Sequence, residues 1–446
     1  MIVIKIYQYQ IKKVLYIDNC LKIFENMNWF SLVGMLILII FAWLISENKK
    51  NQNFRLIVGV LILEFIIGYL LFRLEWGLVL FEKINFVVVK LANIASEGSR
   101  FLFGPLAISP GQEGSLGFIL FFQALPTIVF FSAFISILYY FRIMNLLIES
   151  FAFVFNKLFR ISGAESLVAA SNIFVGIESI LTVRPLISQM TRSELHTILT
   201  AGLATVASNV MAVYIFSLQN VFPQIAGHLV TASILSAPAA ILFSKIIVPE
   251  TGQPLTLGKH VRVEFQKENS LIEAIINGSN AGLKLIFGIV ALLLSVIGLV
   301  SLIDHILMYI FSFFWKEISL KVILGYLFYP FVWGLGIPEK DIFSVATIIG
   351  ERLILTEVYS YQRLAEMLQN QQIEFFSAVV ASYVLCGFTH FASLAIFTGG
   401  IQALVPERTK TLASISLKAL IAATLADLFT GAIASFFYAG SSYLLK

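Results

Sequence analysis

Three polar side chains lie in apolar stretches of the sequence, where an uncompensated polar group is destabilising. Glu178 lies in the segment SNIFVGIESILTVRP, Asn209 in ATVASNVMAVY and His390 in LCGFTHFASLAIFTGG. A carboxylate, an amide or an imidazole in such a setting needs a polar partner or a water-lined cavity. In a membrane segment, an ionisable group is first a candidate for contact with a substrate or an ion. The sequence therefore predicts ligand binding inside a hydrophobic protein.

Each of these residues also has a structural interpretation. Glu178 could form an ion pair with Arg184, and His390 could be a core histidine whose neighbours satisfy its ring nitrogens. The Ser, Thr and Ala residues around Asn209 and His390 are typical of close helix packing in membranes. The sequence leaves both interpretations open.

Composition indicates the class of protein. Of the 446 residues, 59% are hydrophobic and 13% are charged, and the mean hydropathy is +0.90. Soluble domains average about 25% charged residues, so the chain is predicted to be a polytopic membrane protein. The net charge of +4 comes from interspersed charges, without the basic tract that a nucleic-acid partner needs. The distant Cys20 and Cys386 indicate neither a disulfide framework nor a metal cluster.

The lengths of the apolar runs predict the helices, because a spanning helix needs about 20 apolar residues. The runs that meet this requirement are 29–46, 56–73, 116–140, 196–218, 228–248, 279–303, 376–398 and 415–438. Three further regions are apolar but broken: 76–106, 164–190 and 322–362. Irregular backbone at membrane depth must be buried in protein or line a cavity. Broken segments in two halves of a chain therefore indicate the binding site of a transporter.

Positive charges in the loops predict the orientation, because cytoplasmic loops are enriched in Lys and Arg. The residues concerned are Lys49, Lys50, Arg55, Arg142, Lys157, Arg160, Lys259, Arg262, Lys267, Arg408 and Lys410. Their loops share one side of the membrane if both termini lie outside. The stretch 74–115, which carries charges of both signs, is then predicted to be an interfacial amphipathic helix.

In this orientation, segment 164–190 enters and leaves from the cytoplasmic side and segment 322–362 from the outer side. Each is predicted to be a re-entrant helical hairpin followed by two spans, so the two units form an inverted repeat. The predicted fold class is all-α, with about eight transmembrane helices and two oppositely oriented hairpins. The predicted parts are an N-terminal extension (1–28), scaffold helices with the interfacial helix (29–160), the first hairpin and two following helices (161–250), a cytoplasmic loop with a scaffold helix and an outer helix (251–321), and the second hairpin and two following helices (322–446).

The extension has no signal-peptide pattern, because residues 1–26 lack a continuous apolar core and a small-residue cleavage site. Met27 begins an apolar run and is one candidate for the native start. An interfacial helix is the alternative for the preceding residues.

Several blocks of the sequence are similar to one known family. These blocks are FFQALPTIVFFSAFISILYY, SGAESL, SNIFVG, MTRSELH, ASILSAPAAILFSKIIVPET and LCGFTHFASLAIFTGGIQALVPER. In this order they resemble the concentrative nucleoside transporters, and the likeness runs from about residue 60 to the C-terminus. No phosphate-binding loop, HExxH or GxSxG motif is present in the sequence, so an enzyme is not predicted.

The resemblance implies an ion site and a substrate site. The implied Na⁺ ligands are Asn172, the Val175 carbonyl, Thr205 and the Val206 carbonyl. The implied substrate contacts, between two hairpin tips and two interrupted helices, are Gly176, Ile177, Glu178, Ser179, Val210, Glu357, Phe388, His390 and Ser393. Among these, the resemblance assigns the ribose to Glu357 and Ser393 and the nucleobase edge to the first hairpin tip.

This chain departs from the family's pattern at three positions. Ile177 stands where the family has a glutamine, and it can neither donate nor accept a hydrogen bond. His390 stands where the family has an asparagine, and an imidazole can also titrate near neutrality. Thr356 replaces a second asparagine. The tip GIESIL therefore predicts weaker discrimination among nucleobases.

Three further charges at membrane depth have open roles. Glu64 is expected to face another subunit or a scaffold helix. Asp427 could pair with His390 or be a protonated structural group, and Arg352 is expected to anchor the second hairpin near Glu351 or Asp341.

The predicted function is import of nucleosides by a homotrimer in the cytoplasmic membrane of a bacterium, within the lipid bilayer and coupled to Na⁺. Proton coupling through Glu178, His390 or Asp427 is the alternative within this class. A receptor or an assembly protein that reuses the hairpins is the alternative from another class.

Overall fold

The regular secondary structure is helical, as the apolar runs predict. The computed structural model describes residues 27–109, 112–259, 261, 268–311 and 319–438, and at residues 177 and 178 it describes the backbone only. Within these ranges, the extended structure is limited to one isolated bridge between Ser162 and Leu257. Residues 1–26 of the predicted N-terminal extension lie outside the described residues.

Six helical elements of the described residues precede residue 143. They are α2 (Phe30–Leu44), α3 (Phe54–Phe72), α4 (Glu75–Phe103), η1 (Gly104–Ala107), α5 (Leu120–Gln123) and α6 (Thr127–Tyr140). The region 76–106 was predicted to be broken, and this prediction is wrong, because α4 is one helix of 29 residues. It ends at Gly104, which has a positive φ of 54° and precedes Pro105.

The first unit contains the elements α7 (Ile143–Phe159), α8 (Gly163–Asn172), η2 (Ile177–Gln189), α9 (Arg192–Ala204), α10 (Ser208–Leu218) and α11 (Ile225–Ile247). Helices α8 and α9 each begin with a capping box, formed by Ser162 with Glu165 and by Thr191 with Glu194. Helices α9 and α10 are two parts of one interrupted span, whose irregular residues are 205–207.

The second unit follows the long helix α12 (Leu271–Phe311). It contains α13 (Leu320–Trp333), α14 (Glu339–Ile354), α15 (Glu357–Gln369), α16 (Phe375–Val384), α17 (Phe391–Leu404), η3 (Pro406–Arg408) and α18 (Thr409–Tyr438). Segment 322–362 is therefore not one hairpin. Gly336, with a φ of 72°, and Pro338 separate α13 from the helical pair α14–α15.

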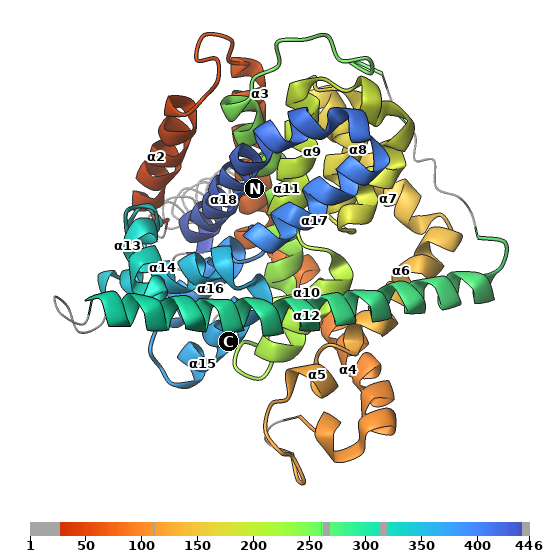
Figure 1. The fold of residues 1–446 in the computed structure, drawn as a ribbon, viewed down its shortest axis with the longest axis vertical. Coiled ribbons are helices and arrows are strands. Elements are labelled where there is room, and N and C mark those ends of the chain that lie inside the picture. The colour runs from red at the N-terminus through yellow and green to blue at the C-terminus, as the bar shows by residue number, and fades with distance from the viewer. Residues whose placement is uncertain (1–26, 110–111, 260, 262–267, 312–318, 439–446) are drawn as a thin grey trace, which may run out of the picture.

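The two units have the same order of elements. Each has one helix (α7 or α13), a helical pair (α8 with η2, or α14 with α15), an interrupted span (α9–α10 or α16–α17) and a long helix (α11 or α18). Figure 1 shows α8 and α9 near the top of the view and α15 in its lower half. In the described residues, six helical segments are long and apolar enough to cross a membrane. Shorter apolar helices, including α2 and the pair α16–α17, complete a set that agrees with the predicted all-α polytopic class.

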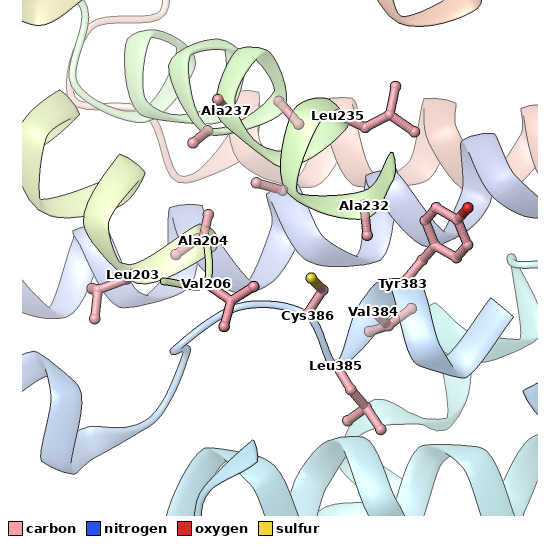
Figure 2. Packing of buried hydrophobic residues seen from close by; sticks show 14 of the residues in the cluster. Leu203, Ala204, Val206, Ala232, Leu235, Ala237, Tyr383, Val384, Leu385 and Cys386 are labelled. Carbon is pink, nitrogen blue, oxygen red and sulfur yellow. The ribbon is translucent and has the colours of Figure 1, made fainter. Parts of the chain in front are cut away.

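The two interrupted spans meet in the core of the protein. The apolar windows of α9–α10, α11 and α18 are each 89% buried. Figure 2 shows Val206 of the first break beside Cys386 of the second, with Ala232 of α11 nearby. The Cys386 Sγ lies 3.7 Å from the carbonyl oxygen of Leu229 on α11. Small residues allow this close approach of irregular backbone.

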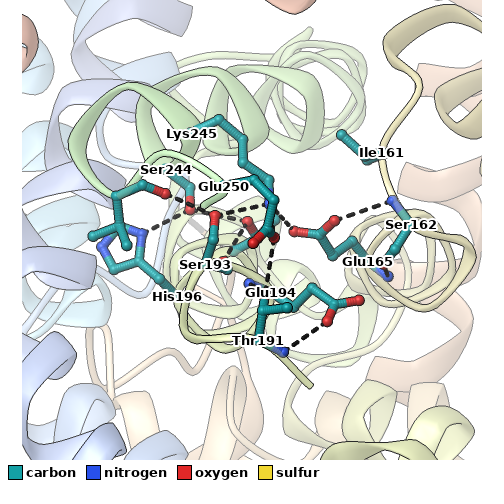
Figure 3. A network of polar contacts seen from close by, with 12 residues as sticks. Ile161, Ser162, Glu165, Thr191, Ser193, Glu194, His196, Ser244, Lys245 and Glu250 are labelled. Atoms are coloured by element: carbon teal, nitrogen blue, oxygen red, sulfur yellow. Dashed lines mark hydrogen bonds and ion pairs between the residues drawn. The ribbon is translucent and has the colours of Figure 1, made fainter. Parts of the chain in front are cut away.

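A polar network fixes the base of the first helical pair (Figure 3). The Lys245 ammonium on α11 forms an ion pair with Glu165 of the first capping box. It also donates to Ser193 Oγ at 2.9 Å and lies 3.6 Å from a Glu250 carboxylate oxygen. Lys245 therefore compensates the carboxylate of Glu165 that caps α8, and it ties the first turns of α8 and α9 to α11.

The loop after α2 is joined to the second and first units by an ion cluster. Glu47 Oε1 lies 2.8 Å from Arg192 at the start of α9 and 2.7 Å from Lys418 on α18. The Arg192 hydrogen bond is the main reason that the pKa of Glu47 falls from its ordinary value of 4.5 to about 2. Its folded-state pKa is depressed, so the cluster stabilises the fold above pH 4.5 and loses this contribution as pH falls through about 2.

We expect Glu47→Gln to lower the free energy of unfolding near neutral pH by about 1 kcal/mol, the upper range for exposed ion pairs. Thermal unfolding in detergent, followed at neutral and acidic pH, measures the effect. The difference from the unmutated protein should shrink as pH falls below 4.5 toward 2. A difference that stays constant with pH would contradict this assignment.

Candidate substrate and ion sites

A cavity of about 410 Å³ lies between α10, α12, α15 and α17. Six of the nine predicted substrate contacts line it: Gly176, Val210, Glu357, Phe388, His390 and Ser393. They come from both units, although up to 217 positions separate them along the chain. The fold therefore brings most of the predicted substrate set together around one space.

Glu357 places one fixed and one open carboxylate oxygen at this cavity. The residue begins α15, and only 4% of its surface is exposed. Its Oε1 accepts a hydrogen bond of 2.9 Å from the Tyr214 hydroxyl. Its Oε2 lies 2.8 Å from His390 Nε2 but makes no hydrogen bond within the described part of the chain. A buried carboxylate oxygen in this state has acceptor capacity for a ligand hydroxyl.

His390 is held in a defined orientation as the N-cap of α17. Its Nδ1 accepts a hydrogen bond of 3.2 Å from the backbone N–H of Ser393. A neutral imidazole that accepts at Nδ1 carries its proton on Nε2. That nitrogen lies 2.8 Å from both Ser393 Oγ and Glu357 Oε2, so the Nε2 edge of His390 faces these two side chains.

The remaining cavity wall is mostly apolar, and part of it was not predicted. Helix α12 contributes Lys284 together with small and aliphatic residues. Lys284 lies inside the apolar run 279–303, so the same rule for charges at membrane depth that selected His390 would have selected it. Asn209 also lines the cavity, but its Nδ2 donates to Ser132 Oγ of α6 at 3.0 Å. Its amide therefore has a structural partner.

The four predicted ion ligands lie where the first helical pair meets the first break. Asn172 ends α8, and its Oδ1 accepts a hydrogen bond of 3.0 Å from Ser179 Oγ. Thr205 follows α9, and its hydroxyl donates to the Ala201 carbonyl at 2.8 Å. Val175 and Val206 are buried in the same region. Neutral oxygens at the C-terminal ends of two helices suit a small hard cation.

The hairpin tip is joined to the break by its backbone. The Ser208 N–H donates to the Phe174 carbonyl at 3.0 Å, and Ser233 Oγ of α11 donates to the Ile173 carbonyl at 2.8 Å. Ser179, predicted as a substrate contact, is absent from the cavity lining and bonds to Asn172 instead. The side chains of Ile177 and Glu178 lie outside what the structure describes.

Arg352 and Asp427 form a buried pair that the sequence did not predict. Arg352 Nη1 lies 2.7 Å from Asp427 Oδ2. Asp427 therefore has a different partner from His390. Asp341 instead accepts hydrogen bonds from Ser377 Oγ at 2.6 Å and from the Glu374 backbone N–H at 2.9 Å. The expectation that Arg352 is anchored by Glu351 or Asp341 is thus replaced by an anchor on α18.

Glu64 faces the interior of the same protomer. It is fully buried on α3, beside the α11 backbone at Ala239. The expectation that Glu64 faces another subunit or a scaffold helix is therefore wrong, because α11 belongs to the predicted part 161–250.

Such a fold, with interrupted spans that meet beside a cavity whose apolar wall carries a few polar groups, is that of a secondary membrane transporter. The chain matches the family descriptions "Na+ dependent nucleoside transporter N-terminus" over residues 33–106, "Nucleoside recognition" over 121–221 and "Na+ dependent nucleoside transporter C-terminus" over 228–435. The protein belongs to the family of concentrative nucleoside transporters. Its family transports nucleosides and is not a family of enzymes.

Relatives cover nearly the whole chain. The transporter YutK of Bacillus subtilis is 36% identical over 92% of this chain and 100% of its own length. The nucleoside permease NupC of Helicobacter pylori is 34% identical over 92% of this chain and 97% of its own length. The structure of CNTnw in an inward-facing substrate-bound state is 31% identical, with a TM-score of 0.84 over 92% of this chain and 98% of that chain. The bacterial permeases indicate a multi-pass protein of the cytoplasmic membrane.

Proposed function

We propose that this protein imports nucleosides together with Na⁺, with the ribose bound by Glu357. The observation that carries the proposal is the open Oε2 of Glu357, which is buried in the cavity beside His390 and Ser393. A carboxylate can accept bonds from hydroxyl groups, and bonds to a charged acceptor are roughly twice as strong as neutral ones. The cavity volume of about 410 Å³ is within the range that small-molecule sites occupy.

The other parts of a nucleoside would meet the remaining cavity residues. Ser393 is a second hydroxyl partner for the ribose, and Phe388 and Val210 provide apolar walls. We assign the nucleobase edge to the tip that runs from Gly176 to Ser179. In this tip, Ile177 offers apolar surface, so we expect Glu178 to supply the main polar contact.

We assign Na⁺, the co-transported ion, to Asn172, Thr205 and the carbonyls of Val175 and Val206. The family description supports sodium in general. The support from this chain is a set of neutral oxygens at the ends of α8 and α9, next to the cavity-lining residue Gly176. An ion at this place would fix the hairpin tip against the break.

Transport requires the hairpin units to move relative to the scaffold. We propose that parts 161–250 and 322–446 move as the transport domain against the scaffold helices, with both termini outside and three protomers in the assembly. Variants of the similar protein CNTnw have been solved in outward-facing and intermediate states, with TM-scores of 0.83 and 0.82. These states support an alternating-access cycle for this chain.

Proton coupling is a second candidate, and the contact between His390 and Glu357 favours it. His390 Nε2 lies 2.8 Å from Glu357 Oε2 in the cavity lining, so this pair is the place where a co-transported proton would meet the substrate site. The Asp427 carboxylate, by contrast, has a fixed cationic partner in Arg352.

Uptake into proteoliposomes tests the function. With an inward Na⁺ gradient, labelled uridine should accumulate, and replacement of Na⁺ by choline should abolish accumulation. Uptake that ignores Na⁺ but follows a pH gradient would support the proton candidate. Absence of nucleoside uptake with either gradient would support a receptor or an assembly protein.

Glu357→Gln tests the ribose contact. The variant keeps the shape and loses the charge, so ribonucleoside binding should weaken by at least ~1 kcal/mol, or roughly fivefold in Kd. Isothermal titration in saturating Na⁺ measures the change. The buried Glu351, which is not in the cavity lining, provides the matched control Glu351→Gln. A nucleoside without ribose hydroxyls should bind both variants alike, and an unchanged Kd for the ribonucleoside would refute the contact.

Asn172→Ala tests the ion site. Removal of one oxygen ligand should raise the Na⁺ concentration for half-maximal uptake, with little change in nucleoside affinity at saturating Na⁺. Asn156→Ala is the control, because Asn156 also bonds a backbone carbonyl in the first unit but lies at the end of α7. An equal effect of the two variants on the Na⁺ requirement would argue against the assigned site.

A further inference from the structure

A buried cluster in the second unit joins the same three kinds of segment that surround the ion site of the first unit. The last turn of α14 provides Arg352, the break after α16 provides Thr389, and α18 provides Asp427. In the first unit, Ser233 of α11 donates to the Ile173 carbonyl at the end of α8, and the Ser208 N–H, just after the break that follows α9, donates to the Phe174 carbonyl.

The guanidinium of Arg352 is surrounded by oxygen atoms. Its Nη1 donates to the Val384 carbonyl at 2.5 Å and to Asp427 Oδ2 at 2.7 Å. The same Oδ2 accepts a hydrogen bond of 2.9 Å from Thr389 Oγ1. Arg352, Asp427 and Thr389 are at most 1% exposed. A carbonyl, a carboxylate and a hydroxyl are also the kinds of oxygen that bind hard cations.

This cluster is not explained by stability alone. Two charges removed from water lose solvation that their attraction barely offsets, and replacing such a pair with apolar residues is often neutral or stabilising. The pair is also incompletely satisfied, because Arg352 Nε and Asp427 Oδ1 have no hydrogen-bond partner among the described residues. A positive charge at this place therefore has a role besides packing.

Helix polarity makes the two places equivalent. Arg352 lies in the last turn of α14, and Val384 ends α16. Asn172 ends α8, and Thr205 directly follows α9. Each place thus lies where two helix C-termini meet, and the partial negative charge of such ends favours a cation.

We propose that Arg352 is a resident cation, which fills in the second unit the position that the first unit offers to an exchangeable Na⁺. This inference rests on the proposed sodium site. The first unit is neutral and needs an ion to cover its helix ends. The second unit carries its cation covalently, together with Asp427 as the counter-charge. Each protomer therefore exchanges Na⁺ at one place only.

Removal of the guanidinium should convert the second position into a sodium site. Arg352→Met leaves the oxygens of Asp427, Thr389 and Val384 without their cation. Full-length protein in detergent is titrated with NaCl at constant ionic strength, with choline as the replacement, and thermal unfolding is followed. A ligand that binds only the folded state raises the unfolding temperature as its concentration rises. The sodium-dependent rise should exceed that of the unmutated protein.

The matched control is the double variant Arg352→Met with Asp427→Asn, which removes both charges. Its sodium-dependent rise should equal that of the unmutated protein, because an amide does not demand a cation. In proteoliposomes, the Hill coefficient for Na⁺ should be about one in the unmutated protein and about two in Arg352→Met.

Each other outcome overturns the proposal. One such outcome is an equal sodium-dependent rise of the unfolding temperature in Arg352→Met and in the unmutated protein. The other is that Arg352→Met stays unfolded at high NaCl while the double variant folds. If neither variant folds, the unmutated protein decides, because a Hill coefficient clearly above one shows a second exchangeable ion. Failure of the proposed function is distinct, since it would appear as Na⁺-independent uptake by the unmutated protein.

Discussion

Backbone groups freed at a helix break inside a membrane must find partners within the protein, because no water is available to bond them. This constraint organises the whole fold. At the first break, the Ser208 N–H bonds to Phe174 of the hairpin tip. At the second break, the Val384 carbonyl accepts from Arg352. The long helices α11 and α18 cover these breaks, which explains why their apolar windows are 89% buried although they are membrane spans.

At the same breaks, the N-terminal ends and the C-terminal ends of the helices lie at different places. Helices α10, α15 and α17 direct their N-terminal ends toward the cavity, through the N-caps Ala207, Thr356 and His390. These positive ends favour the buried carboxylate of Glu357. The C-terminal ends of α8 and α9 lie at the proposed Na⁺ site, and those of α14 and α16 lie at Arg352. Because the spans are interrupted, helix N-termini can point at the carboxylate of Glu357, the proposed acceptor for the substrate. Helix C-termini, which favour positive charge, lie nearby.

The sequence predicted the class, the approximate spans and six of the cavity residues. Long apolar runs indicate the spans, and the few polar residues within them indicate the binding site. It could not predict partners across the fold. Arg352 was expected near Glu351 or Asp341, since sequence distance is the only distance available without a structure, and its partner lies 75 positions away on α18. The region 76–106 was expected to be broken, but residues 75–103 form the single helix α4, although Gly77 and Gly98 lie within it.

In the proposed cycle, a fixed guanidinium supplies the positive charge at the second break and an exchangeable Na⁺ supplies it at the first. This difference determines how Na⁺ affects substrate binding. The second unit has its positive charge at all times, so the position of Glu357 does not depend on ion concentration. In this proposal the first unit does depend on it, because the side chains that it offers to the ion, Asn172 and Thr205, are neutral. Gly176 and Val210, which line the cavity, follow the proposed Na⁺ ligands Val175 and Val206 by one and four residues. Sodium would therefore act on substrate affinity through the wall made by the first unit, while the ribose acceptor stays fixed.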